Sequence, residues 1–260
     1  MFSDWLYLTQ CVHALCLRVE SEHYRRLKDE ESHTMGALYW QLNSIWQAPT
    51  WSTLEYGNKW KMAHYFAAEF FAPTIISSYV STKSDYKVYV TTDGMDGQNG
   101  EYSITAIGWN DNTARRSWSG NFSLNGFASS QVFSQSLDSM LTQANVNASE
   151  VFFELEWKVG SSVVASNEFF LTSFVDVALS PVSFDASVVN MSGNEATVQV
   201  TCSAVAPYTF LDTSVPGRFS DNGFLCRPNA PTTLTFHGKQ SFSSSALIDT
   251  LKIHSVQTTY

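Results

Sequence analysis

The alternation of apolar and polar residues from Thr74 onward constrains this chain more than any other feature. Side chains alternate with a period of two along short segments, which turns rich in Gly, Asn and Asp separate. Strands spaced 8–12 residues apart are typical of immunoglobulin-like β-sandwiches. The pattern predicts strands over 86–91, 102–109, 152–159, 163–171, 183–190, 197–203, 208–211, 232–237 and 251–256, with helical turns over 136–143. We therefore predict two sandwiches, over residues 74–177 and 178–260.

The first 73 residues show helical periodicity instead of the period-two pattern. Apolar residues near the N-terminus recur every three or four positions, which predicts one helix face. They are Trp5, Leu8, Val12, Leu15 and Val19. An apolar run over 35–43 fits a strand buried on both faces, and a second helix is predicted over 59–71. This order is that of a (β/α) barrel, which needs roughly 250 residues, so residues 1–73 are predicted to be its last unit only.

Charge and hydropathy exclude two classes of partner. Lys and Arg number 15 against 24 Asp and Glu, so we expect no basic surface to offset phosphate repulsion and no nucleic-acid partner. No run of 18 apolar residues occurs, so we expect no membrane span. The apolar N-terminus lacks the basic start of a signal peptide, and we interpret it as a helix. The oligomeric state is left open.

The four cysteines fall into two pairs. Cys11 and Cys16 lie five residues apart in a predicted helix, a poor geometry for a disulfide. Cys202 and Cys226 lie in the β-rich tail and are either bridged across two strands or buried as free thiols. No grouping of Cys or His indicates zinc, so we predict no metal site.

Three Asn-x-Ser sequons lie in the β-rich part of the chain. Their asparagines are Asn121, Asn147 and Asn190. Three sequons are more than chance gives in a Ser-rich chain of this size. They favour a secretory or lysosomal route and predict glycosylation at these residues.

The stretch over residues 34–73 is the most specific part of the sequence, because it contains four tryptophans in a fixed order. Its segment Leu-Tyr-Trp-Gln-Leu-Asn-Ser-Ile-Trp-Gln and the residues after it, up to Pro73, resemble the eighth barrel strand, loop and last helix of animal β-mannosidases of glycoside hydrolase family 2. Residues 20–26 resemble the helix before that strand, and 203–225 the family's C-terminal domain. The resemblance implies a (β/α)8 barrel remnant followed by two immunoglobulin-like sandwiches.

The resemblance implies an exo-acting, retaining enzyme that removes terminal β-linked mannose. Its partner would be a mannose-terminated oligosaccharide, its location lysosomal, and it would need no cofactor. Such chemistry requires two carboxylates roughly 5–5.5 Å apart. In the family these stand in Asn-Glu and Ser-Glu-Tyr-Gly-like contexts on earlier strands, and neither context precedes the eighth strand here. We assign no catalytic residue, interpret Glu55 as a structural loop carboxylate, and expect the chain alone to be inactive.

Three residues are candidates for substrate binding. The resemblance implies that Trp40 stacks on the mannose ring, and the alternative is a Trp that fills a core. Asn43 and Trp46, at or just past the predicted strand end, could bond sugar hydroxyls or wall the pocket. Ser44 stands where the family typically has Asp, and Asn58 where it has Gly. A Ser hydroxyl replaces one hydrogen bond but not the charge, which argues against full activity.

Two hypotheses remain. In the first, the chain is the C-terminal fragment of a β-mannosidase. In the second, it is a non-catalytic carbohydrate-binding or structural β-sandwich remnant. In-frame upstream sequence with an Asn-Glu and a Glu-Tyr-Gly element would support the first. If the first segment is a barrel remnant, we expect two helix faces, Trp5/Leu8/Val12 and Trp60/Ala67/Phe71, to lie exposed, and the chain made alone to aggregate.

Overall fold

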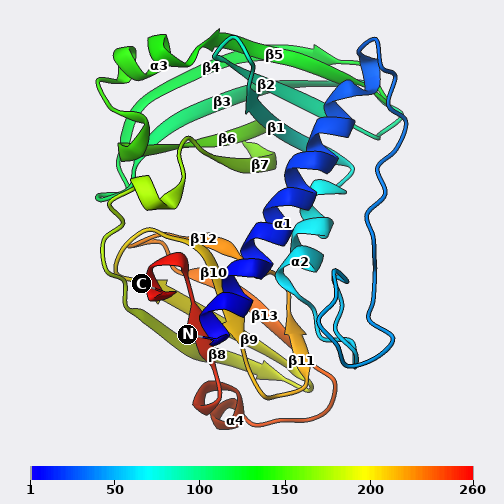
Figure 1. Cartoon of the computed structure of the whole chain (residues 1–260), viewed down its shortest axis with the longest axis vertical. Helices are drawn as coiled ribbons and strands as arrows, with labels where there is room; N and C mark the ends of the chain where they lie inside the picture. The colour runs from blue at the N-terminus through cyan, green and yellow to red at the C-terminus, as the bar shows by residue number, and fades with distance from the viewer. Residues whose placement is uncertain (1, 260) are drawn as a thin grey trace. The chain divides into compact units, whose positions relative to one another are not determined.

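The computed structural model describes residues 2–259, which form two compact units (Figure 1). The C-terminal unit comprises the described residues through Arg18, then Tyr39–Ala68 and the described residues from Leu179 onward. The central unit comprises Val19–Leu38 and Glu69–Ala178. Each unit contains one β-sandwich together with pieces of the first 70 or so residues. The boundaries predicted at 73/74 and 177/178 stay a prediction.

The central unit is an antiparallel sandwich with sheet orders β1-β2-β5 and β4-β3-β6-β7. Its strands are β1 (Thr74–Val80), β2 (Asp85–Thr92), β3 (Gln98–Gly108), β4 (Ala114–Leu124), β5 (Ser129–Ser136), β6 (Val151–Val159) and β7 (Ser162–Phe170). The helix α3 (Leu137–Ala144) and 3-10 turns at Ala148–Glu150 and Phe174–Asp176 complete it. Alternate side chains of the facing sheets meet in a core that includes Tyr86, Ile104, Phe153 and Trp157, all fully buried.

The C-terminal unit has sheet orders β11-β13-β9-β8 and β12-β10-β14. Its elements are β8 (Phe184–Ser192), β9 (Glu195–Cys202), β10 (Ala206–Asp212), β11 (Gly217–Phe219), β12 (Phe224–Cys226), β13 (Thr232–Gly238), α4 (Ser244–Asp249), β14 (Lys252–His254) and a 3-10 turn at Val256–Thr259. Val198, Leu234, Phe236 and Leu247 are buried between the sheets. The predicted period-two strands are confirmed in both units, with bounds that differ by a few residues.

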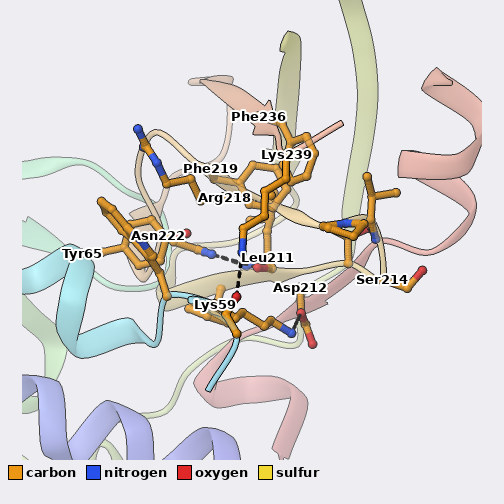
Figure 2. A pocket seen from close by; sticks show the side chains of 17 residues that line it. Lys59, Tyr65, Leu211, Asp212, Ser214, Arg218, Phe219, Asn222, Phe236 and Lys239 are labelled. Atoms are coloured by element: carbon orange, nitrogen blue, oxygen red, sulfur yellow. Dashed lines mark hydrogen bonds and ion pairs between the residues drawn. The ribbon is translucent and has the colours of Figure 1, made fainter. Parts of the chain in front are cut away.

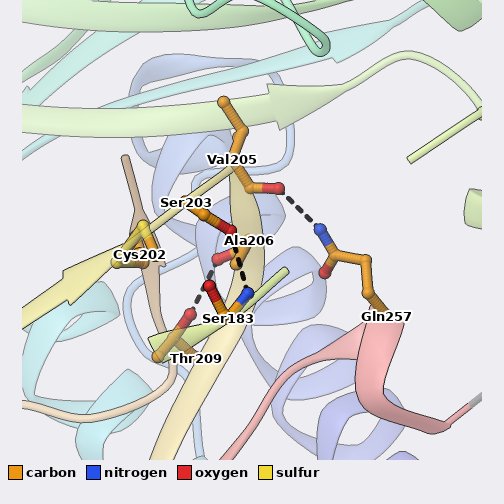
Figure 3. Close-up of a disulfide and its surroundings, with 8 residues drawn as sticks. Ser183, Cys202, Ser203, Val205, Ala206, Thr209 and Gln257 are labelled. Carbon is orange, nitrogen blue, oxygen red and sulfur yellow. Dashed lines mark hydrogen bonds between the residues drawn. A yellow bond between two sulfur atoms is a disulfide. The ribbon is translucent and has the colours of Figure 1, made fainter. Parts of the chain in front are cut away.

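A disulfide joins two strands of the C-terminal unit (Figure 3). Cys202 ends β9 and Cys226 ends β12, and their Cα atoms lie 6.3 Å apart. Of the two alternatives that the sequence left open, the bridge is therefore the one formed. Cys11 and Cys16 are free, the first buried and the second exposed.

The first helix, α1 (Phe2–Arg26), has apolar residues on two faces. Tyr7, Cys11 and Ala14 are buried, and the Tyr7 hydroxyl donates to the Tyr208 carbonyl oxygen of the same unit at 2.7 Å. Trp5 and Val12 lie on another face and are 65% and 62% exposed, as expected, whereas Leu8 is only partly exposed. A helix that is apolar on both sides is normally covered on both, and the described residues cover only one. The exposure expected of the second face, Trp60/Ala67/Phe71, is wrong for Ala67, which is 7% exposed; Trp60 is partly buried, and Phe71 is 41% exposed.

The second helix, α2 (Met62–Phe70), lies beside α1 (Figure 1). The backbone N–H of Met62 donates to Gln10 Oε1 at 3.2 Å, and the Arg18 guanidinium lies 3.9 Å from the centre of the Phe66 ring. The helix predicted over 59–71 is therefore confirmed, but it begins three residues later. The residues just before it pair with a loop instead, since Trp60 forms a β-bridge with Leu54.

The buried strand predicted over residues 35–43 is wrong for this chain. The structure has no strand there, and a 3-10 turn at Leu27–Asp29 precedes an extended segment. Met35, Leu38 and Trp40 are 74%, 100% and 72% exposed. A strand needs a neighbour to bond its backbone groups, and no strand within residues 2–259 pairs with this segment.

Candidate functional site

The predicted substrate-binding residues lie on one segment of the C-terminal unit, residues 40–61, here called the tryptophan loop. A few backbone hydrogen bonds fold it back on itself. The Ser44 N–H donates to the Leu54 carbonyl oxygen at 2.9 Å, and the Lys61 N–H donates to the Thr53 carbonyl oxygen at 3.0 Å. A parallel bridge joins Asn43 to Leu54. These bonds, rather than a continuous sheet, fix the path of the loop.

Three hydroxyl groups of the tryptophan loop form a closed triangle. Ser44 Oγ lies 2.9 Å from Thr50 Oγ1 and 2.6 Å from Ser52 Oγ, and the last two are 2.7 Å apart. Lys61 Nζ donates to Ser52 Oγ at 3.2 Å and to the Thr50 carbonyl oxygen at 3.1 Å. Burial lowers the pKa of this amine, and the charge of Glu55 acts against that shift. Ser44 thus sits in a satisfied hydroxyl network near a cation, without the carboxylate that the resemblance implies there.

Trp40, Asn43 and Trp46 all lie at the surface of this loop. Trp40 and Trp46 are 72% and 66% exposed, and Asn43 is also exposed. Trp40 therefore does not fill a core of this chain. The exposed indole faces are free to pack on the apolar face of a sugar, so the role predicted for these residues stays a prediction that the geometry permits.

Two further ionisable residues of this region, Glu55 and His64, have local structural contacts. Glu55 lies in a turn where its backbone N–H donates to the Lys59 carbonyl oxygen at 2.8 Å, and the charge of its carboxylate acts to raise the pKa of Lys61. His64 Nδ1 lies 2.9 Å from Thr53 Oγ1. Burial lowers the pKa of His64, and the Arg218 guanidinium acts in the same direction. The contact between Thr53 and His64 holds the loop on α2.

The C-terminal unit also contains a cavity of about 300 Å³ that the sequence did not predict (Figure 2). Lys59 and Trp60 of the tryptophan loop and Tyr65 of α2 line one part of it. Residues of β10, β11, β13 and their connections line the rest. Burial raises the pKa of the Tyr65 hydroxyl to about 12, so it stays protonated at neutral pH.

The charged groups around this cavity are paired within the unit. Lys59 Nζ lies 2.5 Å from Asp212 Oδ1, and Lys239 Nζ donates to the Gly57 carbonyl oxygen at 2.7 Å (Figure 2). The Arg218 guanidinium lies 4.7 Å from the centre of the Trp60 ring. These contacts tether the end of the tryptophan loop to the sandwich. The sequence did not predict the two lysine contacts, because Lys59 and Asp212 are 153 residues apart and Lys239 and Gly57 are 182 residues apart. No local sequence pattern connects residues at such separations.

The predicted glycosylation residues lie at the surface. Asn121 is in β4, Asn190 is in β8, and Asn147 precedes the 3-10 turn at Ala148–Glu150. All three are exposed. Within residues 2–259, no cluster of three His, Cys, Asp or Glu side chains could hold a metal ion, and no helix is long and apolar enough to cross a membrane.

Two family models match the two sandwiches. A "Mannosidase Ig/CBM-like domain" matches residues 84–176, and the "Ig-fold domain" of the Ig_mannosidase model matches residues 179–259. The predicted mostly β architecture with immunoglobulin-like domains is thereby confirmed. The class defined by fold and matches is a pair of immunoglobulin-like domains of the kind found in mannosidases.

Curated relatives narrow this class. The β-mannosidase of Capra hircus is 35% identical over 268 residues, which cover 100% of this chain and 30% of the relative. The β-mannosidase of Mus musculus is 34% identical over 269 residues (96% and 30%), and β-mannosidase A of Aspergillus clavatus is 30% identical over 253 residues (90% and 26%). The chain belongs to the β-mannosidase family and corresponds to the C-terminal portion of its members. It spans about 30% of the length of the animal relatives it matches.

Solved structures share the fold. The β-D-mannosidase of Dictyoglomus thermophilum matches with a TM-score of 0.81 at 19% identity, over 98% of this chain and 30% of that one. The exo-chitosanase of Amycolatopsis orientalis matches with a TM-score of 0.68 at 18% identity, over 95% and 33%. At such identities the likeness concerns the fold alone.

Proposed function

We propose that this chain is the C-terminal part of an exo-acting, retaining β-mannosidase that removes terminal β-D-mannose from the non-reducing end of oligosaccharides, including N-glycan fragments. The observation that carries the proposal is the 35% identity to the goat β-mannosidase across the whole chain. The chain contributes to the enzyme without holding its two reacting carboxylates. Those groups belong, in this proposal, to earlier strands of the barrel.

Residues 1–73 are proposed to supply the last unit of a (β/α)8 barrel, in which the segment over 35–43, extended but unpaired here, would become a strand only beside other barrel strands. Two exposed apolar surfaces support this. One is the face of α1 with Trp5 and Val12, and the other is the extended segment with Leu38 and Trp40. Both are of the kind that a monomer normally buries. Neighbouring barrel strands would pair with the segment over 35–43, and barrel helices would cover α1.

The tryptophan loop is proposed to form part of the mannose pocket. Trp40 would stack on the sugar ring, Asn43 would hydrogen-bond a sugar hydroxyl, and Trp46 would line the pocket. Their common exposure on one loop supports this assignment. Residues at the carboxyl ends of barrel strands and the loops after those strands build the active sites of such barrels. The tethers from Lys59 and Lys239 to the rest of the unit would hold that loop in place.

The location proposed is the lysosome, reached through the secretory pathway. The Cys202–Cys226 disulfide supports this, since such bonds form and persist in oxidising compartments. The surface position of all three sequon asparagines is compatible with the same route.

The alternative function is a non-catalytic carbohydrate-binding or structural module. The match of residues 84–176 to an Ig/CBM-like domain favours keeping it. In that case, the 260-residue chain would bind mannosides without cleaving them. Titration of the chain with mannose and mannobiose by calorimetry, with glucose as control, measures this directly.

Hydrolysis of 4-nitrophenyl β-D-mannopyranoside tests the main proposal. The assay compares the 260-residue chain with the longest polypeptide that the gene encodes in frame with it. We expect turnover by the longer polypeptide only. Absence of turnover by both would overturn the proposed activity. Turnover by the short chain would overturn the assignment of both carboxylates to earlier strands and make Glu55 the first residue to substitute.

Two matched substitutions then test the pocket. Trp40 and Trp51 lie on the same loop and are 72% and 65% exposed. We expect Trp40→Ala in the longer polypeptide to lower kcat/KM by roughly tenfold or more, about 1.4 kcal/mol of transition-state stabilisation. Trp51→Ala is the control and should change kcat/KM much less. Equal effects would contradict the specific role of Trp40.

A further inference from the structure

Three long strands, β4, β7 and β8, lie at the edges of the four-stranded sheets and pair on one side only within residues 2–259. β4 pairs with β3 alone, and β8 pairs with β9 alone. The remaining sheet edges are short or covered. β11, β12 and β14 have three residues each, β7 contacts β1, and β5 contacts α3 and the turn at Leu27–Asp29. β4 also contacts α3 and β5, and β8 contacts α4, but no strand within residues 2–259 pairs with the outer edge of either. An unpaired edge is a template for association with another chain unless it is short, charged or covered.

The two halves of β4 differ in how well they are protected against pairing with a strand of another chain. The first half carries two arginines, and the Trp118 indole N–H donates to Gln143 Oε1 of α3 at 3.1 Å. The second half, Ser-Gly-Asn-Phe-Ser-Leu, has no charged residue. Asn121 lies in that half, directly opposite Glu101 of β3. Its side chain is exposed, while Phe122 turns inward and packs on Trp157.

The strand β8 repeats this arrangement in the other unit. Its only charged residue, Asp185, is the second residue of the strand. The rest reads Ala-Ser-Val-Val-Asn-Met-Ser, and Val189 is 57% exposed. A bulge interrupts the pairing between Val188 and Asn190, and Asn190 is exposed. In β4 and in β8, a sequon asparagine thus lies in the half of the strand that has no charged residue.

We propose that N-linked glycans on Asn121 and Asn190 protect these two edges against edge-to-edge association. In the modification, the side-chain amide nitrogen displaces the pyrophosphate group of a lipid-linked oligosaccharide at the anomeric carbon and loses one proton. The lipid pyrophosphate leaves as the bond to the sugar breaks. A hydrated glycan of this size excludes another strand from the edge by its bulk. The proposal rests on the secretory route proposed above but not on any hydrolase activity.

Asn147 offers a natural control. It is exposed, and it begins a 3-10 turn instead of lying in a strand. Its backbone N–H donates to Glu150 Oε2 at 2.7 Å. Asn147 and Asn121 both line open parts of the surface, so nothing closes off either side chain from a sugar. Glycosylation at Asn147 should therefore be possible and have no effect on edge pairing.

The experiment expresses the 260-residue chain behind a cleavable secretion signal in cultured animal cells. Enzymatic deglycosylation in ¹⁸O-water followed by peptide mass spectrometry gives the occupancy of each sequon. Size-exclusion chromatography with light scattering gives the oligomeric fraction at equal concentration. The variants are Gln and, separately, Lys at each of Asn121, Asn147 and Asn190. Association through the exposed face of α1 is common to all variants and cancels in the comparison.

We expect sugars on Asn121 and Asn190, and an oligomeric fraction raised roughly twofold or more by Asn121→Gln or Asn190→Gln. Asn121→Lys and Asn190→Lys should restore the wild-type fraction without any sugar, because a charged edge also resists pairing. Neither substitution at Asn147 should change it. The proposal is overturned if Asn121 or Asn190 is unmodified, if Lys protects no better than Gln, or if Asn147→Gln acts equally. Because the added signal directs the chain into the secretory pathway, absence of sugar at all three sites would overturn the edge protection alone and leave the hydrolysis assay as a separate test of the proposed function.

Discussion

The core of the central sandwich and the tryptophan loop both contain tryptophans, but these side chains are buried in the core and exposed in the loop. Trp157 in β6 is fully buried and packs on Phe122, with ring centres 5.1 Å apart. Trp40 and Trp46 are mostly exposed, although their surroundings in the sequence are just as apolar. The difference is that the sandwich supplies a facing sheet, whereas the described chain supplies no second layer over the loop.

Different forces therefore hold the two regions. Burial of a large apolar side chain contributes about 1.5–3 kcal/mol, and the sandwich gains this many times over. The loop depends on hydrogen bonds such as those among Ser44, Thr50 and Ser52, each worth about 1 kcal/mol net. Apolar burial therefore dominates in the sandwich, whereas nothing within residues 2–259 covers the exposed tryptophans of the loop.

The largest expected effect contrasts two tryptophans. Trp157→Ala leaves a cavity between the sheets and should destabilise the central unit by about 3–5 kcal/mol. Trp40→Ala removes a ring that is 72% exposed and should change stability by no more than about 0.5 kcal/mol. Urea unfolding, followed by circular dichroism, measures both. A comparable loss in Trp40→Ala would contradict the claim that the loop contributes little apolar burial.

The disulfide should give the next largest effect. Cys202 and Cys226 are 24 residues apart in sequence, and a loop of this length implies a contribution of about 3 kcal/mol. The double substitution to Ala should lower the urea midpoint of the C-terminal unit accordingly, and a reductant should do the same to the wild type. Cys16→Ala, at an exposed free thiol, is the control. No response to reductant would mean that the bridge is absent in solution.

The sandwiches could be predicted because their strands alternate clearly. Ile104 and Leu155 stand opposite each other in neighbouring strands, and both sequences show a period of two. The strand β5 was missed because Ser-Ser-Gln-Val-Phe-Ser-Gln-Ser has the composition of a loop. Its partner β2 fixes it as a strand, and pairing between distant segments is invisible to a local pattern.

In the candidate site, too, contacts between neighbours in sequence could be predicted and contacts between distant residues could not. Trp40, Asn43 and Trp46 could be placed together because they are close in sequence. The tethers from Lys59 to Asp212 and from Lys239 to Gly57 could not, because only the folded unit brings them together. The apolar run over 35–43 misled the strand prediction, since such a run becomes a buried strand only beside other strands.

A smaller effect tests the hydrogen-bonded order of the loop itself. Ser52 is fully buried, and Ser52→Ala removes its contacts to Ser44, Thr50 and Lys61. We expect a loss of about 1–2 kcal/mol confined to the loop, because buried polar partners are left unsatisfied. Hydrogen exchange over residues 44–54 should accelerate. Ser117→Ala, which removes an exposed hydroxyl pair with Thr105, is the control and should have almost no effect.

The smallest expected effect is a pH dependence at the contact between the loop and α2. Burial, aided by the Arg218 guanidinium, lowers the pKa of His64 in the folded chain below its ordinary value of 6.5. Near that pH the unfolded chain binds more protons than the folded chain, so stability rises with pH. The contribution is complete above 6.5 and is lost as the pH falls from there toward the lowered pKa. Melting temperatures of the C-terminal unit at about pH 7.5 and about pH 5 measure it.

His64→Gln should reduce the drop in melting temperature between these two pH values, because glutamine does not titrate there. Burial also lowers the pKa of His13 in the same unit, so His13→Gln should reduce the drop independently. Thr53→Val removes the hydroxyl that lies 2.9 Å from His64 Nδ1 and should lower stability at both pH values without removing the titration. If His64→Gln keeps the full wild-type drop, the ring is solvated and the loop is not packed on α2 in solution. The loop would then differ from the sandwich even more than the structure indicates.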